Sequence, residues 1–355
     1  MTNHWIDIKN TDCALIIGSN AAENHPISFK WLLKAREERG ARIISVDPRF
    51  TRTSAKADIY APLRPGTDIA FIGGLINYAL ENNLYFEDYV VNYTNAAFLV
   101  DAGYSFQDGL FAGYNPKTRK YDATTWKYAM GPDEKPLKDP TLTHPRTVFQ
   151  LLKKHYSRYT VEKVCEITGT PKEAYLEVAR TFCATGRPDK SGTIMYAMGA
   201  TQHTVGSQNV RIYAILQLLL GNIGVPGGGV NALRGLANVQ GSTDLGLLFD
   251  QAPGYIALPS AAPEYANLKG YIEKETPKSG YWTNKPKFFV SFLKAMYGEA
   301  ATPENEFGYA YLPKRDPKRN YSYIPLIEAM YDGQIRGAFL FGQNAAVSGP
   351  NTNKE

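Results

Sequence analysis

The sequence predicts an α/β fold with two related parallel-sheet domains, the second of them incomplete. Three observations support this prediction. Short apolar runs alternate with helical patterns over residues 12–80, which is the rhythm of a parallel sheet. One strand-and-turn motif occurs near both ends of the chain. The chain has 355 residues, 44% hydrophobic and 21% charged, so it is globular and long enough for two domains.

The first domain, residues 1–235, is predicted to open with alternating strands and helices. Its elements are expected at residues 14–17, 27–39, 43–46, 59–61 and 67–80. Pro26 suits the first position of the 27–39 helix, where a missing N–H group costs nothing, and Gly40 suits its left-handed end. Thr67 is expected to cap the helix that follows it.

Residues 103–146 interrupt this rhythm. They are rich in tyrosine, glycine and lysine and show little periodicity, which predicts an irregular surface insertion. A plain packed excursion is the simpler interpretation. A docking surface for another subunit is the alternative, because tyrosine-rich patches are typical of interfaces.

Regular elements return after the insertion. Thr170, Pro171 and Glu173 predict a capping box at the start of a helix. Further elements are expected at residues 193–197, 207–220, 288–296, 323–331 and 338–341, of which the first and the last are strands. The glycine-rich stretch 221–246 is predicted to allow a close approach to the backbone. The second domain is expected to span residues 236–355.

The repeated motif is an apolar strand that opens into a Gly-x-Asn turn. Residues 14–26 read ALIIGSNAAENHP, and residues 338–350 read AFLFGQNAAVSGP. Six of the thirteen aligned positions are identical, namely Ala14 and Ala338, Gly18 and Gly342, Asn20 and Asn344, Ala21 and Ala345, Ala22 and Ala346, and Pro26 and Pro350. Two matching copies predict two similar binding sites, with a chance likeness of two short turns as the alternative.

The turn has the chemistry of a phosphate site. Glycine at the end of a strand lets a ligand approach the backbone, and the amides of the following helix attract an anion. Asn20 is expected to brace the loop or to bind the ligand. Asp47, at the end of the next strand, suits ribose hydroxyls, and Arg49 suits a phosphate, with a solvated surface charge as its alternative. Each copy is therefore predicted to bind a phosphate-bearing nucleotide.

Other features narrow the class of protein. Asp68 follows Gly66 at a helix start and suits base recognition or a helix cap equally well. Neither a GxGxxG nor a GxxxxGKS motif is present. The three cysteines form no CxxC, which argues against an iron–sulfur or structural zinc site made by this chain alone. The net charge of +5 suits anionic ligands better than nucleic acid, and no apolar run is long enough to span a membrane.

These motifs make the chain resemble the catalytic subunit of molybdenum- or tungsten-dependent formate dehydrogenases, especially the respiratory type that contains selenocysteine. The motifs are GSNAAENHP, VDPRFTRT, PGTD, MGATQHTVG, GGGVNALRGLANVQGSTDLG and GQNAAVSGPN. The first, third and last mark the wider molybdopterin oxidoreductase superfamily, whereas ALRGLANVQGSTDLG is far more specific to formate dehydrogenases. The resemblance covers essentially the whole chain and implies the molybdopterin oxidoreductase fold.

The family uses two molybdopterin guanine dinucleotides on one Mo or W ion, which the resemblance assigns to the two copies of the motif. One dinucleotide would be held by Gly18, Ser19 and Asn20, its guanosine and phosphates by Asp47, Arg49, Gly66 and Asp68, and the pterin side by Gly199, Thr201 and Gln202. The second dinucleotide would be held by Gly342, Gln343, Asn344, Ser348 and Asn351. Further cofactor-binding candidates are Glu23, Gly235 and Gln240.

The catalytic arginine of the family matches Arg234 in the sequence Leu233-Arg234-Gly235. A buried guanidinium can hold both oxygens of formate in a planar fork. His203 is the second catalytic candidate, with a histidine hydrogen-bonded in the protein interior as its alternative. Gln240 is also interpreted as a brace for the arginine loop or the cofactor.

Two features of the family have no match in this sequence. One is the selenocysteine or cysteine that ligates the metal, followed by a histidine, and the other is the four-cysteine site of a 4Fe–4S cluster. No metal ligand is therefore assigned to this chain. We expect both features to precede Met1, so the chain is predicted to be an internal fragment, or a chain whose start follows an in-frame selenocysteine codon.

The resemblance implies oxidation of formate to carbon dioxide, with electrons passing to iron–sulfur clusters in anaerobic respiration. The implied partners are an iron–sulfur electron-transfer subunit and a membrane cytochrome subunit, with no nucleic acid. The implied location is the periplasm, reached through a twin-arginine signal upstream of this chain, with the cytoplasm as the alternative. A nitrate-reductase-like molybdopterin enzyme and a non-catalytic cofactor-binding fragment are the alternative functions.

Overall fold

The computed structural model describes residues 1–107, 109–236, 238–278, 280–349, 351 and 353. They form two compact units, Met1–Gly235 and Leu236–Glu355. Most of the strands, and most of the residues that the sequence assigns to a site, belong to the first unit.

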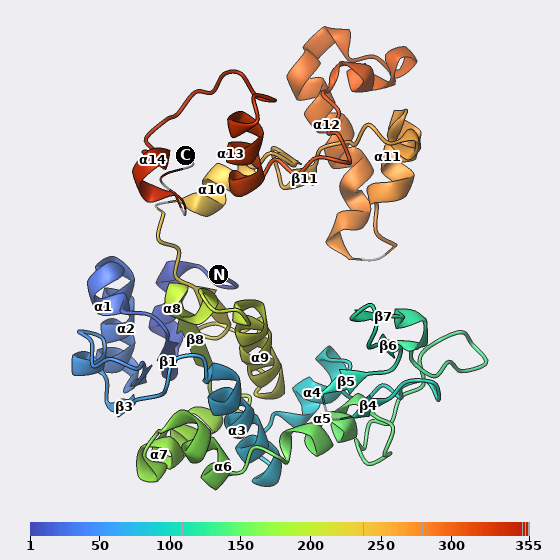
Figure 1. The fold of residues 1–355 in the computed structure, drawn as a ribbon. Coiled ribbons are helices and arrows are strands. Elements are labelled where there is room, and N and C mark those ends of the chain that lie inside the picture. The colour runs from blue at the N-terminus through green and yellow to red at the C-terminus, as the bar shows by residue number, and fades with distance from the viewer. Residues whose placement is uncertain (108, 237, 279, 350, 352, 354–355) are drawn as a thin grey trace. The chain divides into compact units, whose positions relative to one another are not determined.

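The first unit is built on a five-stranded parallel sheet with the strand order β3-β2-β1-β8-β9 (Figure 1). Its strands are β1 (Cys13–Ile17), β2 (Arg42–Val46), β3 (Ile59–Ala61), β8 (Gly192–Tyr196) and β9 (Val230–Ala232). Strand β1 lies between β2 and β8, so Cys13 faces both Arg42 and Gly192. The chain therefore runs outward from β1 to β3 and then returns to the other side of β1.

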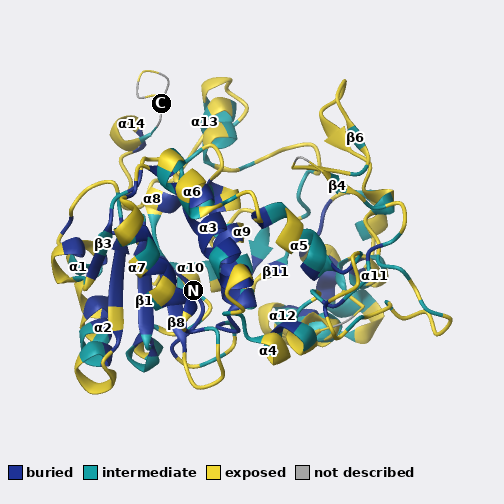
Figure 2. Ribbon diagram, turned by 90° about the horizontal axis from the view of Figure 1, so that it is seen from below, coloured by how far each residue is buried: buried dark blue, intermediate teal, exposed yellow. Residues whose placement is uncertain are grey.

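Helices cover both faces of this sheet. One face is covered by α3 (Asp68–Glu81), α6 (Val161–Thr168), α7 (Lys172–Cys183) and α9 (Gly206–Leu219), and the other by the 3₁₀ segment Trp5–Asn10 and α2 (Pro26–Arg39). Successive residues of β1 point to opposite faces, so Leu15 and Ile17 lie in one core and Ala14 and Ile16 in the other. Figure 2 shows β1, β8 and much of α3 in the colour of buried residues.

The sequence predicts the ends of α2 and the N-cap position of α3 at Thr67 correctly, but Thr67 makes no side-chain capping bond and the cap predicted for α7 is wrong. Helix α2 begins at Pro26 and ends at Gly40, whose φ is 69°. The Thr67 hydroxyl donates to the carbonyl oxygen of Arg64 at 2.6 Å instead of accepting from a helix amide. The Thr170 hydroxyl donates in the same way to Pro62 at 2.6 Å, and α7 begins after Pro171 with no capping box. Both hydroxyls serve loop carbonyls that need a donor.

The glycine-rich stretch contains a strand that the sequence does not reveal. Strand β9 pairs in parallel with β8 and forms the edge of the sheet. Gly227 precedes it with a φ of 75°, and a Cβ atom there would lie 2.3 Å from the carbonyl carbon of Asn10. The close approach predicted for this stretch is therefore an approach to another part of the chain at this point.

The tyrosine-rich insertion contains two short hairpins. Their strands are β4 (Phe106–Gln107), β5 (Leu110–Phe111), β6 (Tyr114–Asn115) and β7 (Lys120–Tyr121). Its aromatic rings contact one another, with ring centroids 4.8 Å apart for Phe106 and Phe111 and 5.1 Å apart for Phe111 and Trp126. Most of its residues are exposed, which agrees with a surface insertion, and a docking role for it stays a prediction.

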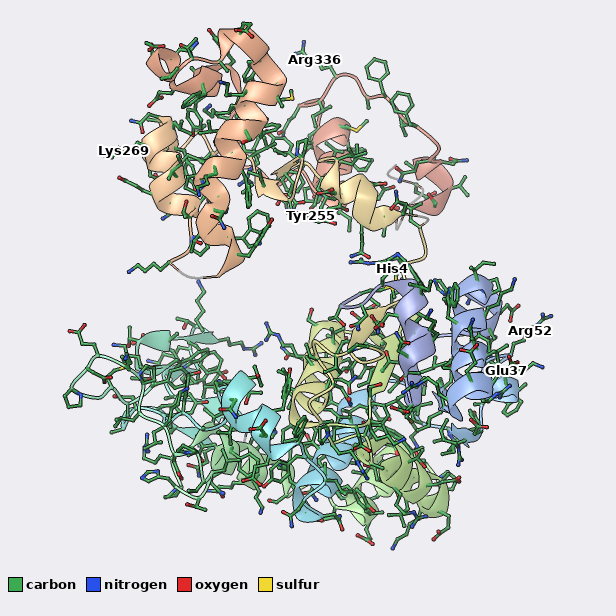
Figure 3. The ribbon with its side chains drawn as sticks, turned by 180° about the vertical axis from the view of Figure 1, so that it is seen from behind. His4, Glu37, Arg52, Tyr255, Lys269 and Arg336 are labelled. Carbon is green, nitrogen blue, oxygen red and sulfur yellow. The ribbon has the colours of Figure 1, made fainter. Side chains whose placement is uncertain are left out.

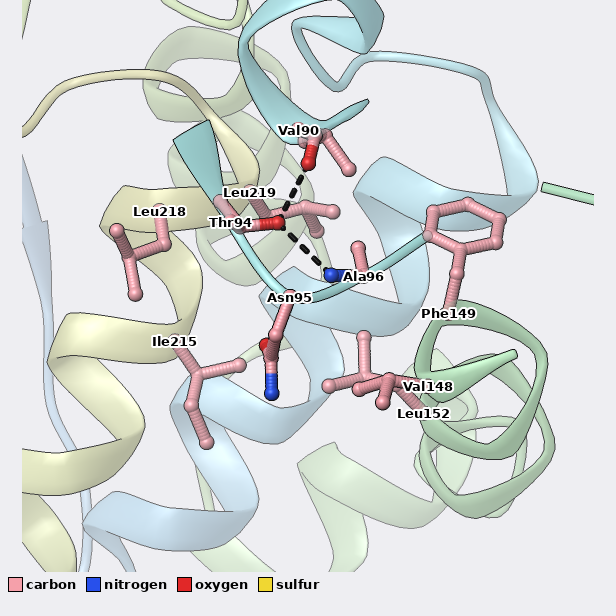
Figure 4. Close-up of a pocket in the computed structure, with 10 residues that line it drawn as sticks. All are labelled: Val90, Thr94, Asn95, Ala96, Val148, Phe149, Leu152, Ile215, Leu218 and Leu219. Atoms are coloured by element: carbon pink, nitrogen blue, oxygen red, sulfur yellow. Dashed lines mark hydrogen bonds between the residues drawn. The ribbon is translucent and has the colours of Figure 1, made fainter. Parts of the chain in front are cut away.

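A small apolar cavity lies where the insertion's flanking helices meet α9 (Figure 4). It holds about 100 Å³ and is lined from α4 (Glu87–Tyr93) and the turn after it, α5 (Val148–Tyr156) and α9. The Thr94 hydroxyl, which lines it, donates to the carbonyl oxygen of Val90 at 2.5 Å. With its one hydroxyl satisfied and mostly hydrocarbon walls, this space is a packing gap between helices.

The second unit has a helical core of its own. Its elements are α10 (Val239–Asp244), β10 (Gln251–Ala252), β11 (Ile256–Ala257), α11 (Leu268–Glu275), α12 (Lys285–Tyr297), the 3₁₀ segment Pro303–Tyr311, α13 (Tyr323–Tyr331) and α14 (Ala345–Ser348). Tyr271 and Phe289 stack at the centre with ring centroids 4.0 Å apart, and Leu293 and Tyr309 pack around them. Strands β10 and β11 form an antiparallel pair.

The strand predicted over residues 338–341 is wrong. These residues adopt no strand, and Phe339 and Phe341 are 91% and 88% exposed. A parallel strand needs a neighbouring strand to which its backbone can hydrogen-bond. No strand among the described residues of the second unit pairs with residues 338–341. The parallel sheet predicted for this unit is therefore not formed by its described residues.

Candidate functional site

A cavity lies at the carboxyl ends of four strands of the first unit. The cavity holds about 520 Å³ and is lined by residues that follow each of these strands. They are Gly18 after β1, Asp47 after β2, Met198 and Gly199 after β8, and Gly235 after β9. A second space of about 310 Å³ shares Gly18, Asp47, Met198 and Gly199 with the first. Because the strand order reverses between β1 and β8, this is the edge where open α/β sheets bind ligands.

Two glycines allow the loops after β1 and β8 to meet. Gly18 has a φ of 62°, and a Cβ atom on it would lie 2.5 Å from the backbone nitrogen of Ala200. A Cβ atom on Gly199 would lie 2.6 Å from the carbonyl oxygen of Gly18. Any side chain at either position would push the loops apart, so the floor of the cavity is bare backbone.

Asn20 braces the loop, which is one of the two roles predicted for it. Its Oδ1 atom accepts from the backbone nitrogen of Thr53 at 3.3 Å and from the Thr53 hydroxyl at 3.1 Å. Its amide nitrogen donates to Glu23 at 2.8 Å. Glu23 thus contacts the turn through Asn20, while Asn20 itself lines the cavity.

Asp47 and Arg49 both line the larger cavity. The carboxylate of Asp47 accepts from the backbone nitrogen of Arg49 at 2.9 Å. Partial burial raises the pKa of Asp47 above its ordinary value, although the hydrogen bond and charge of Arg49 oppose this. The side chain of Arg49 is exposed, and no ion pair of it is among the described contacts. The pair offers a ligand both an acceptor and a cation.

Asp68 opens α3 and lines the smaller cavity with Gln202 and His203. It is 4% exposed and accepts from the Tyr213 hydroxyl at 3.3 Å. Burial is the main cause that raises the pKa of Asp68, and His203 opposes it. His203 contacts the carbonyl oxygen of Gly199 through Nε2 at 2.7 Å, so one of its nitrogens is engaged by the loop after β8.

Two of the predicted residues lie beside the cavities without lining them. Gly66 has a φ of 82° and stands next to Pro65, which does line the smaller cavity. Thr201 lies in the short helix α8 (Met198–Thr201), and its hydroxyl faces the sulfur of Met198 at 3.8 Å. These two residues support the turns that carry the lining residues.

Arg234 lies at the rim of the larger cavity, between the lining residues Leu233 and Gly235. The expectation of a buried guanidinium is wrong for this structure, in which Arg234 is exposed. The main chain of Arg234 is held in place, because its carbonyl oxygen accepts from Nε2 of His25 at 2.8 Å. Burial of the side chain would need a covering segment over this rim.

The remaining predicted residues belong to the second unit. Gln240 lies in α10, where its carbonyl oxygen accepts from the hydroxyl of Tyr255 at 2.7 Å (Figure 3). Gly342 has a φ of 65°, and the Ser348 hydroxyl donates to the carbonyl oxygen of Asn344 at 2.8 Å. Asn351 is exposed, and Pro350 lies outside the described residues. The second copy of the motif thus keeps the turn of the first.

Sequence reasoning assigned Ser19 to the dinucleotide and missed His25, and both residues bring an unusual polar group to the larger cavity. The hydroxyl of Ser19 and Nδ1 of His25 are buried and find no hydrogen-bond partner among the described residues, and both residues line the cavity. The signal was available, because both belong to the GSNAAENHP motif. Buried polar atoms without partners are costly, so they mark a place where a ligand or water is expected.

A glycine floor, unsatisfied polar atoms and an exposed arginine at a switch point are typical of an α/β domain that binds a ligand at this edge of its sheet. The model of the molybdopterin oxidoreductase family matches residues 1–109 and 141–355. The chain belongs to the molybdopterin oxidoreductase family. The unmatched part, residues 110–140, lies within the tyrosine-rich insertion.

Curated relatives narrow the likeness further. The chain is 56% identical over 360 residues to formate dehydrogenase 2 subunit alpha (cytochrome c-553) of Nitratidesulfovibrio vulgaris, covering all of this chain and 35% of that protein. It is 55% identical to formate dehydrogenase subunit alpha of Megalodesulfovibrio gigas and 49% identical to the nitrate-inducible formate dehydrogenase major subunit of Escherichia coli, with the same coverage. The chain thus spans about a third of the length of these relatives.

Among solved structures, acetylene hydratase from Pelobacter acetylenicus matches at a TM-score of 0.41 and 23% identity, over 63% of this chain and 25% of that one. Within the described residues, no group of three or more His, Cys, Asp or Glu side chains could hold a metal ion. No helix in the described parts of the chain has both the length and the apolar character needed to cross a membrane.

Proposed function

We propose that this chain is the part of a formate dehydrogenase catalytic subunit that holds a molybdopterin guanine dinucleotide and presents the arginine that binds formate. The observation that carries the proposal is the cavity at the carboxyl ends of β1, β2, β8 and β9. High identity to subunits named formate dehydrogenase supports the substrate. The dinucleotide form of the cofactor is part of the proposal.

The residues at the cavity fit such a ligand. Gly18 and Gly199 let a pyrophosphate lie against bare backbone, where N–H groups at the start of a helix stabilise negative charge. Arg49 supplies a cation for the phosphates, and Asp47 supplies an acceptor for ribose hydroxyls. Asp68, at the smaller cavity, offers an acceptor to the N–H groups of guanine. The Ser19 hydroxyl would gain the partner that it lacks.

Formate would be held at the rim by Arg234. Formate is a small planar carboxylate, and a guanidinium matches its two oxygens with two parallel N–H donors. His203 would lie near the same loops. Its ring would hold a proton at this site. When bound, the cofactor with its Mo or W ion would supply a two-electron acceptor for the oxidation of formate to carbon dioxide, which also releases one proton.

The second copy of the motif is proposed to hold the second dinucleotide, through Gly342, Asn344, Ser348 and Asn351. Its support is the shared turn, with a φ of 65° at Gly342 against 62° at Gly18. Electrons are proposed to leave through a 4Fe–4S cluster to an iron–sulfur subunit and a cytochrome in anaerobic respiration, and selenocysteine is proposed as the metal ligand. A relative whose name includes cytochrome c-553 supports this partner and a periplasmic location.

Substitution of Arg234 tests the proposed role in the complete subunit. We expect R234A to lower kcat/KM for formate at least about 100-fold while molybdopterin content stays unchanged, because a positioned charged donor is removed. R234K, which keeps the charge and loses the planar fork, should lie between R234A and the unchanged protein.

The matched control is R336A, which removes an exposed arginine from the second unit (Figure 3). Near-normal kcat/KM for formate in R234A would contradict the proposal. Turnover of nitrate in place of formate would favour the alternative molybdopterin enzyme, and absence of any turnover with the cofactor and metal bound would favour a non-catalytic cofactor-binding module.

A further inference from the structure

His25 is a residue of the larger cavity for which the fold and the proposed function have so far given no role. It lies between α1 (Ala21–Asn24) and α2, and its backbone is fixed at both ends. Its N–H group donates to the carbonyl oxygen of Ala21 at 2.9 Å, and its carbonyl oxygen accepts from the Ser28 hydroxyl at 2.8 Å. Its ring stacks on Trp5, with centroids 5.9 Å apart and planes 23° apart. The ring therefore has one well-defined orientation.

The two ring nitrogens of His25 have different surroundings. Nε2 lies 2.8 Å from the carbonyl oxygen of Arg234, and a carbonyl oxygen can only accept, so Nε2 carries the proton. In the neutral ring this leaves a lone pair on Nδ1. That atom is buried, has no hydrogen-bond partner in the part of the chain that the structure describes, and belongs to a residue that lines the cavity. A buried acceptor without a partner costs stability until a donor arrives.

The hydrogen bond from Nε2 of His25 helps to position the main chain of Arg234. Its side chain is exposed, and Gly235 beside it has no neighbouring atom within 4 Å of an added Cβ position. The loop after β9 is thus open at this point, and the hydrogen bond from His25 is a long-range tie, 209 residues apart in sequence. A ligand that engages Nδ1 would stiffen the ring and, through Nε2, the main chain of Arg234.

We propose that His25 is a positioning residue that couples the two halves of the site: Nε2 holds the main chain of Arg234 at the rim, and Nδ1 accepts an N–H or O–H group of the cofactor in the cavity. This inference rests on the proposed function, since it takes the cavity ligand to be a nucleotide-bearing cofactor. The donor would be a ring or amine N–H group or a sugar hydroxyl.

Two substitutions separate the two nitrogens. Glutamine places an N–H donor near the position of Nε2, so H25Q should keep the tie to Arg234 and lose the contact with the ligand. Asparagine places an acceptor near Nδ1 and is too short to reach the Arg234 carbonyl, so H25N should show the opposite. H25F keeps a ring for Trp5 and removes both nitrogens. The matched control is H155N, because Nδ1 of His155 is also buried without a partner but its ring lies against Phe106 and Tyr156.

The tie to Arg234 is measured without any ligand. Trypsin cleavage after Arg234 is followed by mass spectrometry in the 355-residue chain, with cleavage after the exposed Arg119 as the internal reference. H25N and H25F should speed cleavage after Arg234 about fivefold, because they remove the hydrogen bond to the carbonyl oxygen of Arg234. H25Q and H155N should stay within about twofold of the unchanged chain. Equal rates in H25N, H25F and the unchanged chain would overturn the tie.

The contact with the ligand is measured with GDP as the probe. We expect GDP to bind the unchanged chain and to slow cleavage after Arg234, and H25Q and H25F to weaken GDP binding about tenfold while H25N does so less. Equal GDP affinity in all variants would overturn the role of Nδ1. Failure of GDP to bind the unchanged chain would instead contradict the proposed nucleotide site. The hydrogen bond between His25 and Arg234 would still be tested by the cleavage rates measured without ligand.

Discussion

The two copies of the strand-and-turn motif have the same turn and different surroundings. After residues 14–17, Gly18 has a φ of 62° and a short helix begins at Ala21; after residues 338–341, Gly342 has a φ of 65° and a short helix begins at Ala345. The turn of the first copy is preceded by a fully buried strand, whereas the turn of the second is preceded by an exposed segment with no strand partner among the described residues. Local sequence thus determines the turn, and neighbouring strands determine whether the apolar run becomes a strand.

The largest expected difference between the copies concerns their apolar runs. Ile17 is 0% exposed, whereas Phe341 is 88% exposed. We expect I17A to lower the free energy of unfolding by about 2–5 kcal/mol, because it leaves a cavity in the core. F341A should change it by less than about 0.5 kcal/mol. Urea denaturation of the 355-residue chain checks both values, and a comparable loss in F341A would show that this segment is packed.

The next difference concerns the two glycines. G18A would place a Cβ atom 2.5 Å from the backbone of Ala200 in addition to imposing a left-handed conformation on alanine. G342A meets no atom within 4 Å and carries only the conformational cost, about 1–2 kcal/mol. We therefore expect G18A to destabilise the chain more than G342A and also to weaken GDP binding. Equal losses of stability would mean that the loop after β8 yields easily.

The buried carboxyl group of Asp68, which lines the smaller cavity beside the first copy, gives the stability of the first unit a pH dependence. Burial raises the folded-state pKa of Asp68 above 3.8, so the folded protein holds this proton to higher pH than the unfolded chain does. Stability from this group is therefore greatest at low pH and falls as the pH rises through the interval between 3.8 and the folded pKa. In D68N this loss is absent.

The measurement for Asp68 is the free energy of unfolding of D68N relative to the unchanged chain as a function of pH. We expect the variant to gain in relative stability as the pH rises above 3.8, and to reach a plateau above the folded pKa. The control is D332N, at an exposed position of the second unit. A relative stability of D68N that falls with rising pH would show that the carboxylate is stabilised in the folded state.

The smallest effects concern two serine hydroxyls near the two turns. The Ser19 hydroxyl is buried without a partner, so S19A should leave stability unchanged or raise it by a few tenths of a kcal/mol while it weakens GDP binding. The Ser348 hydroxyl makes an exposed bond to Asn344, so S348A should lower stability by at most about 0.5 kcal/mol. Thermal melting and calorimetric binding of GDP distinguish these outcomes, and tighter binding in S19A would contradict the proposed contact.

Much of the first unit follows from the sequence. The expected strands at 43–46 and 59–61 match β2 and β3, because each has a clear apolar pattern and clear ends. In the second unit, the helix expected at 323–331 matches α13 for the same reason. Strand β9 was missed, since three residues between glycines show no periodicity. Thr67 is the N-cap residue of α3 as predicted, but its hydroxyl bonds the carbonyl oxygen of Arg64 instead of a helix amide. The cap predicted at Thr170 was wrong, because its hydroxyl bonds the distant Pro62 and α7 begins after Pro171.

The sequence by itself determined the α/β class, the two Gly-x-Asn turns, the glycines that line the cavity and the family, because these depend on short-range patterns and motifs. Only the tertiary structure decided which apolar runs are strands, that Asp68 is buried and that Arg234 is exposed. It also decided that His25 hydrogen-bonds the carbonyl group of Arg234. Strand pairing, desolvation and a hydrogen bond across 209 residues all depend on which segments meet in space. No local pattern in the sequence encodes which distant segments come into contact.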